Sequence, residues 1–477
     1  MKKLTSQIKE RFSTGHWPGF LTGIISSLMN LFLPTVLVRI LTPEDVGIYK
    51  IFFLYIQSFT FLSLAGAPLY SVFYFIGKED GKSFVDHAWK TSAILSTFAL
   101  ILGLIFSPLI AQKTALTLNQ TLILLFSGAI ITPSSFYGEY ILAKGKTLAG
   151  PLFHSSFEIL KGIAIILCAV ITRDINITFY CFGISFILKL TLSVILGKRE
   201  GLLNLNIQKE KIKEVVSYCA PMSLAGLLGF FLEKIDMLTL SSYLTPRDFA
   251  FYSMGCLVIP PLFILEMSVT KVLMPKLSRL WHNQGLTQMA KEFRKAQADI
   301  AYLMIPAVFG LVLFSTPIIK ILFTEKYIES AVYLKVFAFS YLAYIIPHDT
   351  IARASGNTKW VLKVYLAITP LSLVSVIFVA RSYGAFYALI LSVLLRFVPK
   401  IWGVIYSSRK TKSKISDLLP LRSYLQNVLI NFVLVIIISF LKIYISSDKM
   451  WFLVGGPLYA SGFFGFQYLT KMKVNKS

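Results

Sequence analysis

Three ionisable residues within one apolar segment are the first that could do chemistry. His154, Glu158 and Lys161 are spaced at i, i+4 and i+7 in the segment 148–171, so a helix would place all three on one face. An ionisable group in the middle of a membrane helix costs about 2.5 to 3.5 kcal/mol on insertion scales, and such groups therefore face a bundle interior or an aqueous cavity. The spacing predicts either a wet cavity or a self-neutralising Glu158–Lys161 pair that joins helices.

A second charged group lies in the apolar segment 214–243. Glu233 and Asp236 are three residues apart, which places them on a shared helix face with Lys234 beside them. These three residues are candidates for ion coupling or gating. Asp236 could bind a coupling cation, or it could pair with Lys234 or Lys335 and hold two halves of the protein together; the residues leave both alternatives open.

Further cations and one helix break complete the set of candidates. Lys189 and Arg396 are equivalent positions of an internal repeat, so they could flank an anionic pyrophosphate or could snorkel to lipid headgroups. Lys335 lies nearer the middle of its segment and is a candidate for a translocation cavity. Pro260 and Pro261 are expected to break their helix, because neither donates a backbone hydrogen bond. The freed carbonyls could line a cavity or permit bending, or the break could be a fixed kink.

The sequence predicts no catalytic, cofactor or metal site. No nucleophile, base and orienting group can be combined, and the five histidines lack metal-ligand spacing. The run 145–147, Gly-Lys-Thr, ends like a phosphate-binding loop, but the required first glycine is replaced by Tyr140. Four cysteines lie singly in apolar stretches: Cys168, Cys181, Cys219 and Cys256. They show no CxxC spacing, so we expect packing residues rather than a disulfide framework or a zinc site.

The composition indicates which elements must position these residues. The chain has 477 residues, of which 56% are apolar and 15% charged, and its mean hydropathy is +0.70. Soluble proteins carry about 25% charged residues, so a soluble enzyme is excluded. Fourteen near-continuous apolar runs are long enough to cross the roughly 30 Å of a bilayer as helices rather than barrel strands. They are 19–41, 47–76, 91–111, 121–143, 148–171, 177–197, 214–243, 249–275, 298–323, 329–352, 360–380, 383–407, 424–445 and 451–470.

The links between these runs predict the orientation. The first run is too long for a signal peptide and has no small-residue cleavage site, so we expect it to be retained. The net charge of +24 does not indicate nucleic-acid binding, because most basic residues lie in short links between apolar runs. The links on the side of both termini hold 31 Lys and Arg against 10 on the other side, which predicts cytoplasmic termini. Glu139 and Glu266 lie near predicted cytoplasmic helix ends and are expected to be solvated.

An internal repeat organises the predicted helices. The turn Leu41–Tyr49 recurs as Leu244–Tyr252 with five identities in nine, and two weaker matches follow in the same order. In this turn we expect the proline to stop the preceding helix and the aspartate to cap the following one. The repeat predicts six-helix lobes over 1–200 and 201–410, with two added helices in 411–477. Because six is even, the lobes form parallel repeats, which favours a cavity between two bundles and alternating access.

The arrangement of six, six and two helices resembles the polysaccharide transporter branch of the multidrug/oligosaccharidyl-lipid/polysaccharide flippase superfamily. The turn Leu41–Tyr49, its copy, and the stretch Lys234-Ile-Asp236 carry this resemblance, which covers the whole chain. It implies a V-shaped, two-lobed flippase in the bacterial cytoplasmic membrane. Its cargo would be a lipid-linked oligosaccharide, usually on undecaprenyl pyrophosphate, used for surface polysaccharides such as O-antigen. We expect a monomer with no cofactor and no nucleic-acid partner, whose partners are the cargo, the bilayer and polysaccharide-assembly proteins.

Three other functions compete with this one. A cation-coupled multidrug antiporter of the same superfamily would typically have twelve helices, so the two added helices disfavour it. A peptidoglycan-precursor flippase would also have fourteen helices. A membrane glycosyltransferase or polymerase would need a catalytic carboxylate in a sizeable loop, and the predicted outer links are too short to hold one.

Overall fold

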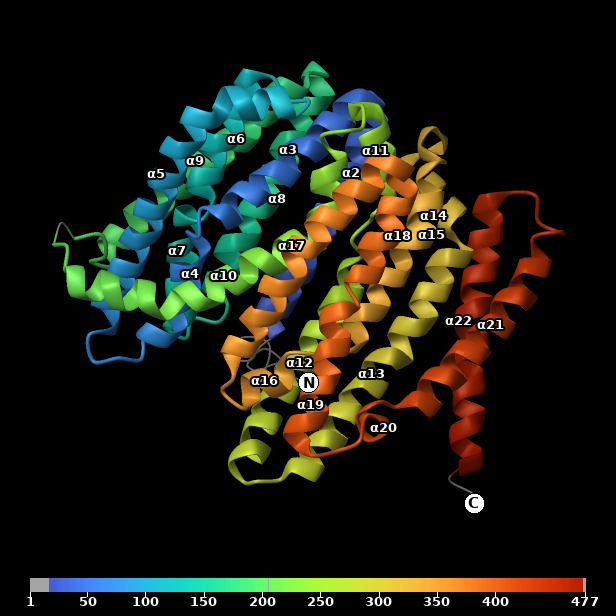
Figure 1. The fold of residues 1–477 in the computed structure, drawn as a ribbon. Helices are drawn as coiled ribbons and strands as arrows, with labels where there is room; N and C mark the ends of the chain where they lie inside the picture. Colours follow the sequence, from blue (N-terminus) through green and yellow to red (C-terminus); the bar gives the residue numbers. More distant parts are fainter. Residues whose placement is uncertain (1–16, 205, 475–477) are drawn as a thin grey trace, which may run out of the picture. The chain divides into compact units, whose positions relative to one another are not determined.

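The computed structural model describes residues 17–204 and 206–474, and every regular element in these ranges is a helix (Figure 1). Within these ranges, ten helices are long and apolar enough to cross a membrane, or up to twelve if each of two bent pairs counts as one span. The prediction of an all-α, multi-pass membrane protein is therefore confirmed. The finer count of fourteen spans stays a prediction.

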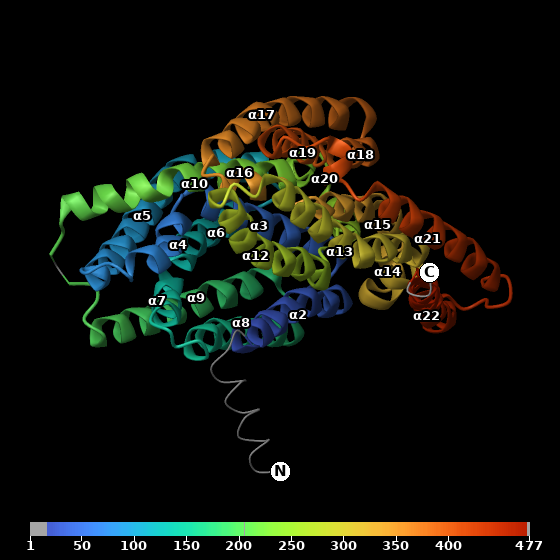
Figure 2. The same ribbon diagram turned by 90° about the horizontal axis from the view of Figure 1, so that it is seen from below.

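The chain forms two compact units, Met1–Ala250 and Phe251–Ser477. The helices of the first unit are α2 (Trp17–Ile40), α3 (Pro43–Leu62), α4 (Gly66–Phe75), α5 (Gly81–Lys113), α6 (Leu118–Ile131), η1 (Pro133–Ser135), α7 (Phe136–Ala143), α8 (Ala149–Thr172), α9 (Ile175–Arg199) and α10 (Lys209–Leu240). In this unit α8 lies between α2 and α9 (Figure 2), and α10 packs against α3, α4 and α5. The predicted division into six-helix lobes is based on the sequence repeat, whereas these two units are defined by compact packing. The predicted lobes therefore stay a prediction.

The boundary between the two units falls within α11 (Pro246–Gly255). The helices of the second unit are α12 (Pro260–His282), α13 (Leu286–Leu313), α14 (Ser315–Phe323), η2 (Glu325–Tyr327), α15 (Ser330–Ala338), η3 (Phe339–Ile345), α16 (Thr350–Ala354), α17 (Thr358–Tyr383), α18 (Ala385–Leu395), α19 (Val398–Thr411), α20 (Ile415–Leu418), α21 (Leu421–Leu441) and α22 (Asp448–Val474). The two helices α21 and α22 pack against each other and against α13, where Phe314, Ile438, Trp451 and Tyr459 form an apolar core.

The repeated turn is capped by threonine, which corrects the expectation for the aspartate. The Thr42 hydroxyl accepts the backbone N–H of Asp45 at 3.2 Å, and Thr245 accepts that of Asp248 at the same distance. Each aspartate instead accepts the threonine hydroxyl at 2.7 Å. The proline is the first residue of the following helix, where its missing N–H has no intrahelical partner to lose.

The two copies of this turn lie against each other within the first unit. A Cβ placed on Gly47 would be 1.7 Å from the backbone oxygen of Pro246, so this contact requires a residue without a side chain. Arg247 and Glu44 approach to 4.0 Å beside it. The repeat thus brings equivalent segments, 203 residues apart in the chain, into direct backbone contact.

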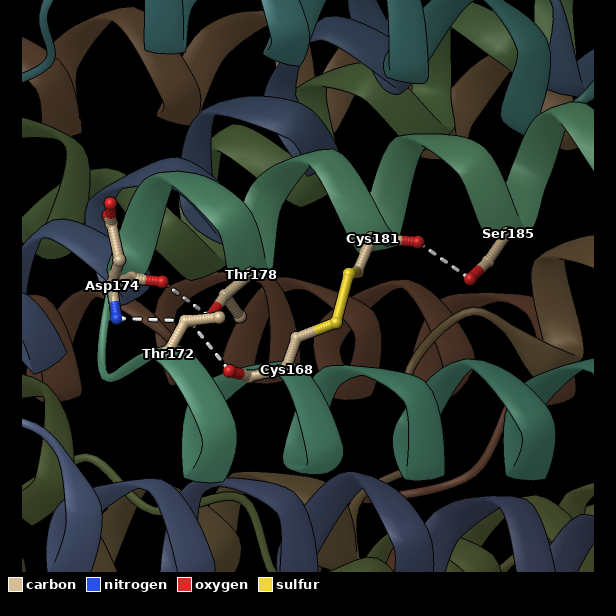
Figure 3. Close-up of a disulfide and its surroundings, with 6 residues drawn as sticks. All are labelled: Cys168, Thr172, Asp174, Thr178, Cys181 and Ser185. Carbon is tan, nitrogen blue, oxygen red and sulfur yellow. Dashed lines mark hydrogen bonds between the residues drawn. A yellow bond between two sulfur atoms is a disulfide. The ribbon is translucent and has the colours of Figure 1, made fainter.

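A disulfide joins Cys168 of α8 to Cys181 of α9, as Figure 3 shows. The prediction that all four cysteines are packing residues is therefore wrong for this pair, although Cys219 and Cys256 are buried. The antiparallel turn between the two helices aligns cysteines that are 13 residues apart. The turn itself is ordered by Thr172, whose hydroxyl accepts the Asp174 N–H at 3.3 Å and donates to the Cys168 carbonyl at 2.7 Å.

Candidate functional site

The charged stripe predicted on α8 lies beside α7 and α9 in the first unit. His154, Glu158 and Lys161 follow one another along α8, and α9 contributes Lys189, which is only 4% exposed. Glu139 of α7 joins them, with a side chain that is 24% exposed. The Glu139 carboxylate is thus partly exposed, and the packing of α7 on α8 brings it close to His154.

His154 connects the cation of α9 to the carboxylate of α7. Its Nε2 lies 3.4 Å from Glu139 Oε1, and its Nδ1 lies 3.5 Å from Lys189 Nζ. An ammonium group can only donate hydrogen bonds, so the Nδ1 of a neutral His154 must be the acceptor toward Lys189. The imidazole proton is then on Nε2, which faces the Glu139 carboxylate. A Cβ on Gly138 would lie 2.5 Å from His154 Nε2, so the absence of a side chain at Gly138 makes room for the imidazole.

Glu158 and Lys161 form an ion pair on α8 with a separation of 2.5 Å. The Lys161 ammonium also lies over two rings of α9, at 5.8 Å from the centroid of Phe182 and 5.4 Å from that of Phe186. Lys189 lies 5.7 Å from the same Phe186 ring. The pair foreseen as an alternative to a cavity is present, and the ammonium groups of Lys161 and Lys189 both lie near the Phe186 ring.

Taken together, the cluster is charge-balanced. Glu139 and Glu158 carry two negative charges, Lys161 and Lys189 carry two positive ones, and His154 is the fifth ionisable group. Protonation of any one carboxylate or of the imidazole therefore gives the site a net positive charge. In a low-dielectric surrounding such a change acts strongly on a nearby anion.

A cavity of about 500 Å³ adjoins the cluster. Its lining is mostly apolar, and α3, α4, the η1 region and α10 add a minority of polar side chains, namely Thr60, Ser71, Thr132, Ser135, Ser223 and the thiol of Cys219. Ser135 connects the cavity to the cluster, since its hydroxyl accepts a hydrogen bond from Lys189 Nζ at 3.2 Å. The buried ammonium is thus one side chain away from a cavity large enough for a small ligand.

Helix breaks at this depth explain the cavity. The α3–α4 pair bends by 72° at its break, and Pro133 separates α6 from α7. Backbone carbonyls freed by the breaks are satisfied by serines of neighbouring helices, with Ser92 donating to Ala65 at 2.8 Å and Ser193 donating to Ser134 at 2.5 Å. Interrupted helices are tolerated at membrane depth only where such partners or a polar cavity exist.

The second unit holds a histidine that the sequence analysis left unassigned. His348, between η3 and α16, is buried, and its Nδ1 lies 3.1 Å from Lys400 Nζ. The Tyr365 hydroxyl lies 3.3 Å from its Nε2. Tyr365 follows His154 by 211 residues, the offset of one of the repeat matches, so the repeat was the signal that could have directed attention to this position.

Arg396 and Lys335 lie in the second unit. The Arg396 guanidinium follows α18 and lies over the Phe337 ring, 5.2 Å from its centroid. Lys335 is exposed on α15, and within the described part of the chain its ammonium has no carboxylate at ion-pair distance. Whether either residue contacts cargo stays a prediction.

The three charged residues of α10 differ in burial. Asp236 is fully buried at 0% exposure, Lys234 is partly buried and Glu233 is exposed. The three therefore do not form one equally buried face. Their role in ion coupling or gating stays a prediction.

At the second break, α12 begins at Pro260 with Pro261 as its second residue, and it bends from α11 by 50°. The Tyr341 hydroxyl of η3 occupies this break, where it accepts the Ile259 N–H at 2.8 Å and donates to the Leu257 carbonyl at 2.7 Å. One side chain thus satisfies a backbone donor and a backbone acceptor exposed by the break.

A second, largely apolar cavity of about 590 Å³ lies between α12, α13, α14 and α22. Leu303, Pro306, Phe452 and Phe463 are among its lining residues. Among residues 17–204 and 206–474, no three His, Cys, Asp or Glu side chains are placed to hold a metal ion.

Comparison with known proteins shows the family. The model of a family described as "Polysaccharide biosynthesis protein" matches residues 36–332. This chain belongs to that family. It is also 25% identical over 331 residues to the capsular polysaccharide biosynthesis protein CapF of Staphylococcus aureus, a match that covers 68% of this chain and 80% of the relative.

Solved structures with the same fold are transporters of the superfamily predicted from the sequence. The lipid II flippase MurJ in an inward closed conformation matches with a TM-score of 0.73 and 16% identity, over 96% of this chain and 99% of that one. A MATE transporter of Vibrio cholerae, VcmN, matches with a TM-score of 0.55 and 16% identity, over 87% of this chain and 99% of that one. At these identities the likeness shows the fold alone.

Proposed function

We propose that this protein is a flippase that moves a lipid-linked oligosaccharide across the bacterial cytoplasmic membrane for surface polysaccharide synthesis. The observation that carries the proposal is the buried Lys189, which donates a hydrogen bond to Ser135 at the edge of a cavity that also holds several hydroxyls. An ammonium in this position can neutralise part of a pyrophosphate, and hydroxyls can bind sugar or phosphate oxygens. The role is transport rather than catalysis.

The first unit offers both charges and hydroxyls to the polar head of such a cargo, through the cluster around Lys189 and the side chain of Ser135. We further propose that both termini are cytoplasmic, that the protein acts as a monomer with fourteen spans, and that polysaccharide-assembly proteins receive its product.

Reconstitution in liposomes tests the proposal. A fluorescent pyrophosphate-linked saccharide would be flipped by the wild type, and Lys189→Gln would reduce the rate by at least about tenfold, since a charge-assisted bond is worth about 1.5 to 3 kcal/mol. Lys326→Gln, at an exposed lysine of η2, is the matched control and should flip at the wild-type rate. Equal rates in the wild type and Lys189→Gln would contradict the assignment.

The same vesicles test what drives transport. We propose that Asp236, the fully buried carboxylate of α10, responds to a coupling ion. Flipping should then depend on an imposed proton or sodium gradient in the wild type and lose that dependence in Asp236→Asn. Gradient dependence that survives in the variant would remove Asp236 from the mechanism.

A second function is favoured by one observation, the TM-score of 0.73 to a lipid II flippase. The alternative is transport of a peptidoglycan lipid precursor, and lipid II offered to the same vesicles distinguishes the two. Efflux of cationic dyes without any lipid flipping would instead assign the protein to multidrug antiport.

Labelling of single cysteines tests the proposed orientation. A cysteine at Glu44 should react with a membrane-impermeant maleimide added to intact cells, whereas one at Lys412 should not. Reaction at Lys412 would contradict the predicted helix count.

A further inference from the structure

A hollow of about 450 Å³ on the first unit lies between α4 and α10, apart from the residues around Lys189. It is lined by Tyr74, Phe75, Glu210, Lys213, Glu214, Ser217 and Tyr218. Its volume lies within the range of small-molecule sites, roughly 300 to 1,000 Å³. Its aromatic and charged lining is a combination that neither lipid contact nor core packing requires.

Two stacked tyrosines form the aromatic part of the hollow. The rings of Tyr74 and Tyr218 are 4.3 Å apart between centroids and 13° from parallel, and the residues are 52% and 47% exposed. Stacking holds the pair in one orientation, so binding on it costs little side-chain entropy. An exposed aromatic ring offers a face of partial negative charge, which attracts the weakly positive C–H groups of a sugar ring.

Charged side chains on the same face of α10 show that water reaches the hollow. Glu210 and Lys213 are exposed, and within residues 17–204 and 206–474 neither has an ion-pair partner. Glu214 is paired with Lys78, whose ammonium lies 5.0 Å from the centroid of the Phe75 ring.

We propose that this hollow is a saccharide-binding subsite that receives sugar residues of the cargo before translocation. The tyrosine pair would contact the C–H face of a pyranose, while Glu210 accepts and Lys213 donates hydrogen bonds to its hydroxyls. The inference rests on the proposed function, and it specifies that the first unit recognises the sugar part of the cargo. It also places selection at the end of the unit that the loop charges predict to face the cytoplasm.

The hollow shares one lining residue with the cavity beside Ser135 described above. Tyr218 lines both, and Ser135, the hydrogen-bond partner of Lys189, lines the deeper one. A cargo whose sugar rests on Tyr218 could therefore extend its phosphates toward Ser135 and Lys189. This order separates sugar recognition from anion recognition within a single unit.

Direct binding of a saccharide without its lipid tests the subsite. The probe is the free oligosaccharide released by mild acid from the lipid-linked pool of the host cell, radiolabelled and measured by equilibrium dialysis against the full-length protein in nanodiscs. Tyr74→Ala and Tyr218→Ala should each raise the Kd by about five- to tenfold, the effect expected of one aromatic contact. Tyr218→Trp, which keeps a ring face, should stay within about twofold of the wild type.

Matched variants separate binding from stability. Tyr444→Ala removes an equally polar aromatic residue that is 85% exposed and lies far along the chain from the hollow, and it should bind like the wild type. Glu210→Gln gives a second measurement should either alanine variant misfold, and it should also weaken binding. Equal binding by the wild type and all three hollow variants, or no saturable binding by the wild type, would overturn the subsite.

Transport by the same proteins distinguishes this inference from the proposed function. Flipping by the wild type with an unchanged half-saturation concentration in Tyr218→Ala would overturn the subsite and leave the flippase proposal standing. Tyrosine-dependent binding of the saccharide without any flipping would support the subsite and contradict the flippase proposal.

Discussion

The Glu158–Lys161 pair gives a sharp test of the charge balance around Lys189. Glu158→Gln leaves the cluster with an excess positive charge, Lys161→Met leaves an excess negative charge, and the double variant restores neutrality. The two side chains are 24% and 13% exposed, between the exposed pairs worth about 0 to 1 kcal/mol and the buried pairs whose disruption costs about 3 to 5 kcal/mol. We therefore expect each single substitution to cost about 2 kcal/mol.

Thermal unfolding in detergent measures this cost. For a unit of about 250 residues, 1 kcal/mol shifts the Tm by roughly 2 to 4 °C, so each single variant should melt about 4 to 8 °C below the wild type. The double variant should recover to within about 4 °C, because the uncompensated charge is gone. The pair Lys144–Glu200 in the same unit is the control: its side chains are 37% and 30% exposed, and its disruption should cost less than about 1 kcal/mol.

Additive losses in the double variant would refute the reasoning, because independent effects imply no coupling between the charges. Wild-type melting in either single variant would refute it as well. If the pair also serves transport, both single variants should flip cargo more slowly than the double variant does in the liposome assay.

Three further predictions concern stability. Gly47→Ala should lower the Tm by at least about 4 °C, because the new Cβ would lie 1.7 Å from a backbone oxygen. Gly66→Ala is the control and should not lower the Tm, because no atom lies within 4 Å of its new Cβ. Equal Tm values for the two variants would contradict the close contact at Gly47. The Lys144 ammonium, by hydrogen bonding, holds the pKa of Glu200 below its ordinary value, so the pair stabilises the fold at neutral pH and ceases to do so as the pH falls through that lowered pKa. Lys144→Met should therefore lower the Tm by about 1 to 3 °C at pH 7 and leave it unchanged once the pH is well below the lowered pKa of Glu200. A pH-independent difference would argue against the ion pair. Tyr341→Phe should lower the free energy of unfolding by about 1 to 3 kcal/mol, since it leaves the Ile259 N–H and the Leu257 carbonyl at the second helix break without their hydrogen-bond partner. An unchanged Tm would show that these two backbone groups form other hydrogen bonds.

Hydropathy and loop charge predict the helical, membrane-spanning architecture well, because each apolar run must satisfy its own backbone in lipid. The charged stripe of α8 was also predictable, since its spacing depends on one helix alone. Glu139 and Ser135 were not, because their places beside His154 and Lys189 depend on how α7 and η1 pack. Contacts between helices are decided by side-chain fit, which a single apolar run does not encode.

The disulfide and the second histidine were missed for the same reason. Cys168 and Cys181 meet only because the turn after α8 is short and antiparallel. His348 gains its neighbours Lys400 and Tyr365 from three different segments, so no local spacing reveals it. The one signal available in the sequence was the equivalence of positions in the internal repeat. It indicated Lys189 and Arg396 as candidates, and it could also have indicated Tyr365 as the equivalent of His154.

The disulfide of α8 and α9 also bears on how the chain enters the membrane. Cytosolic thiols are kept reduced, so a stable bond between Cys168 and Cys181 requires this end of the hairpin to reach an oxidising compartment. The loop charges predict the same end to lie outside, by an argument that does not involve cysteine. The bond would therefore close only after the hairpin has been inserted with its turn outward. The disulfide would therefore distinguish correctly inserted protein from protein whose hairpin was inserted the other way round, because the latter would keep two free thiols.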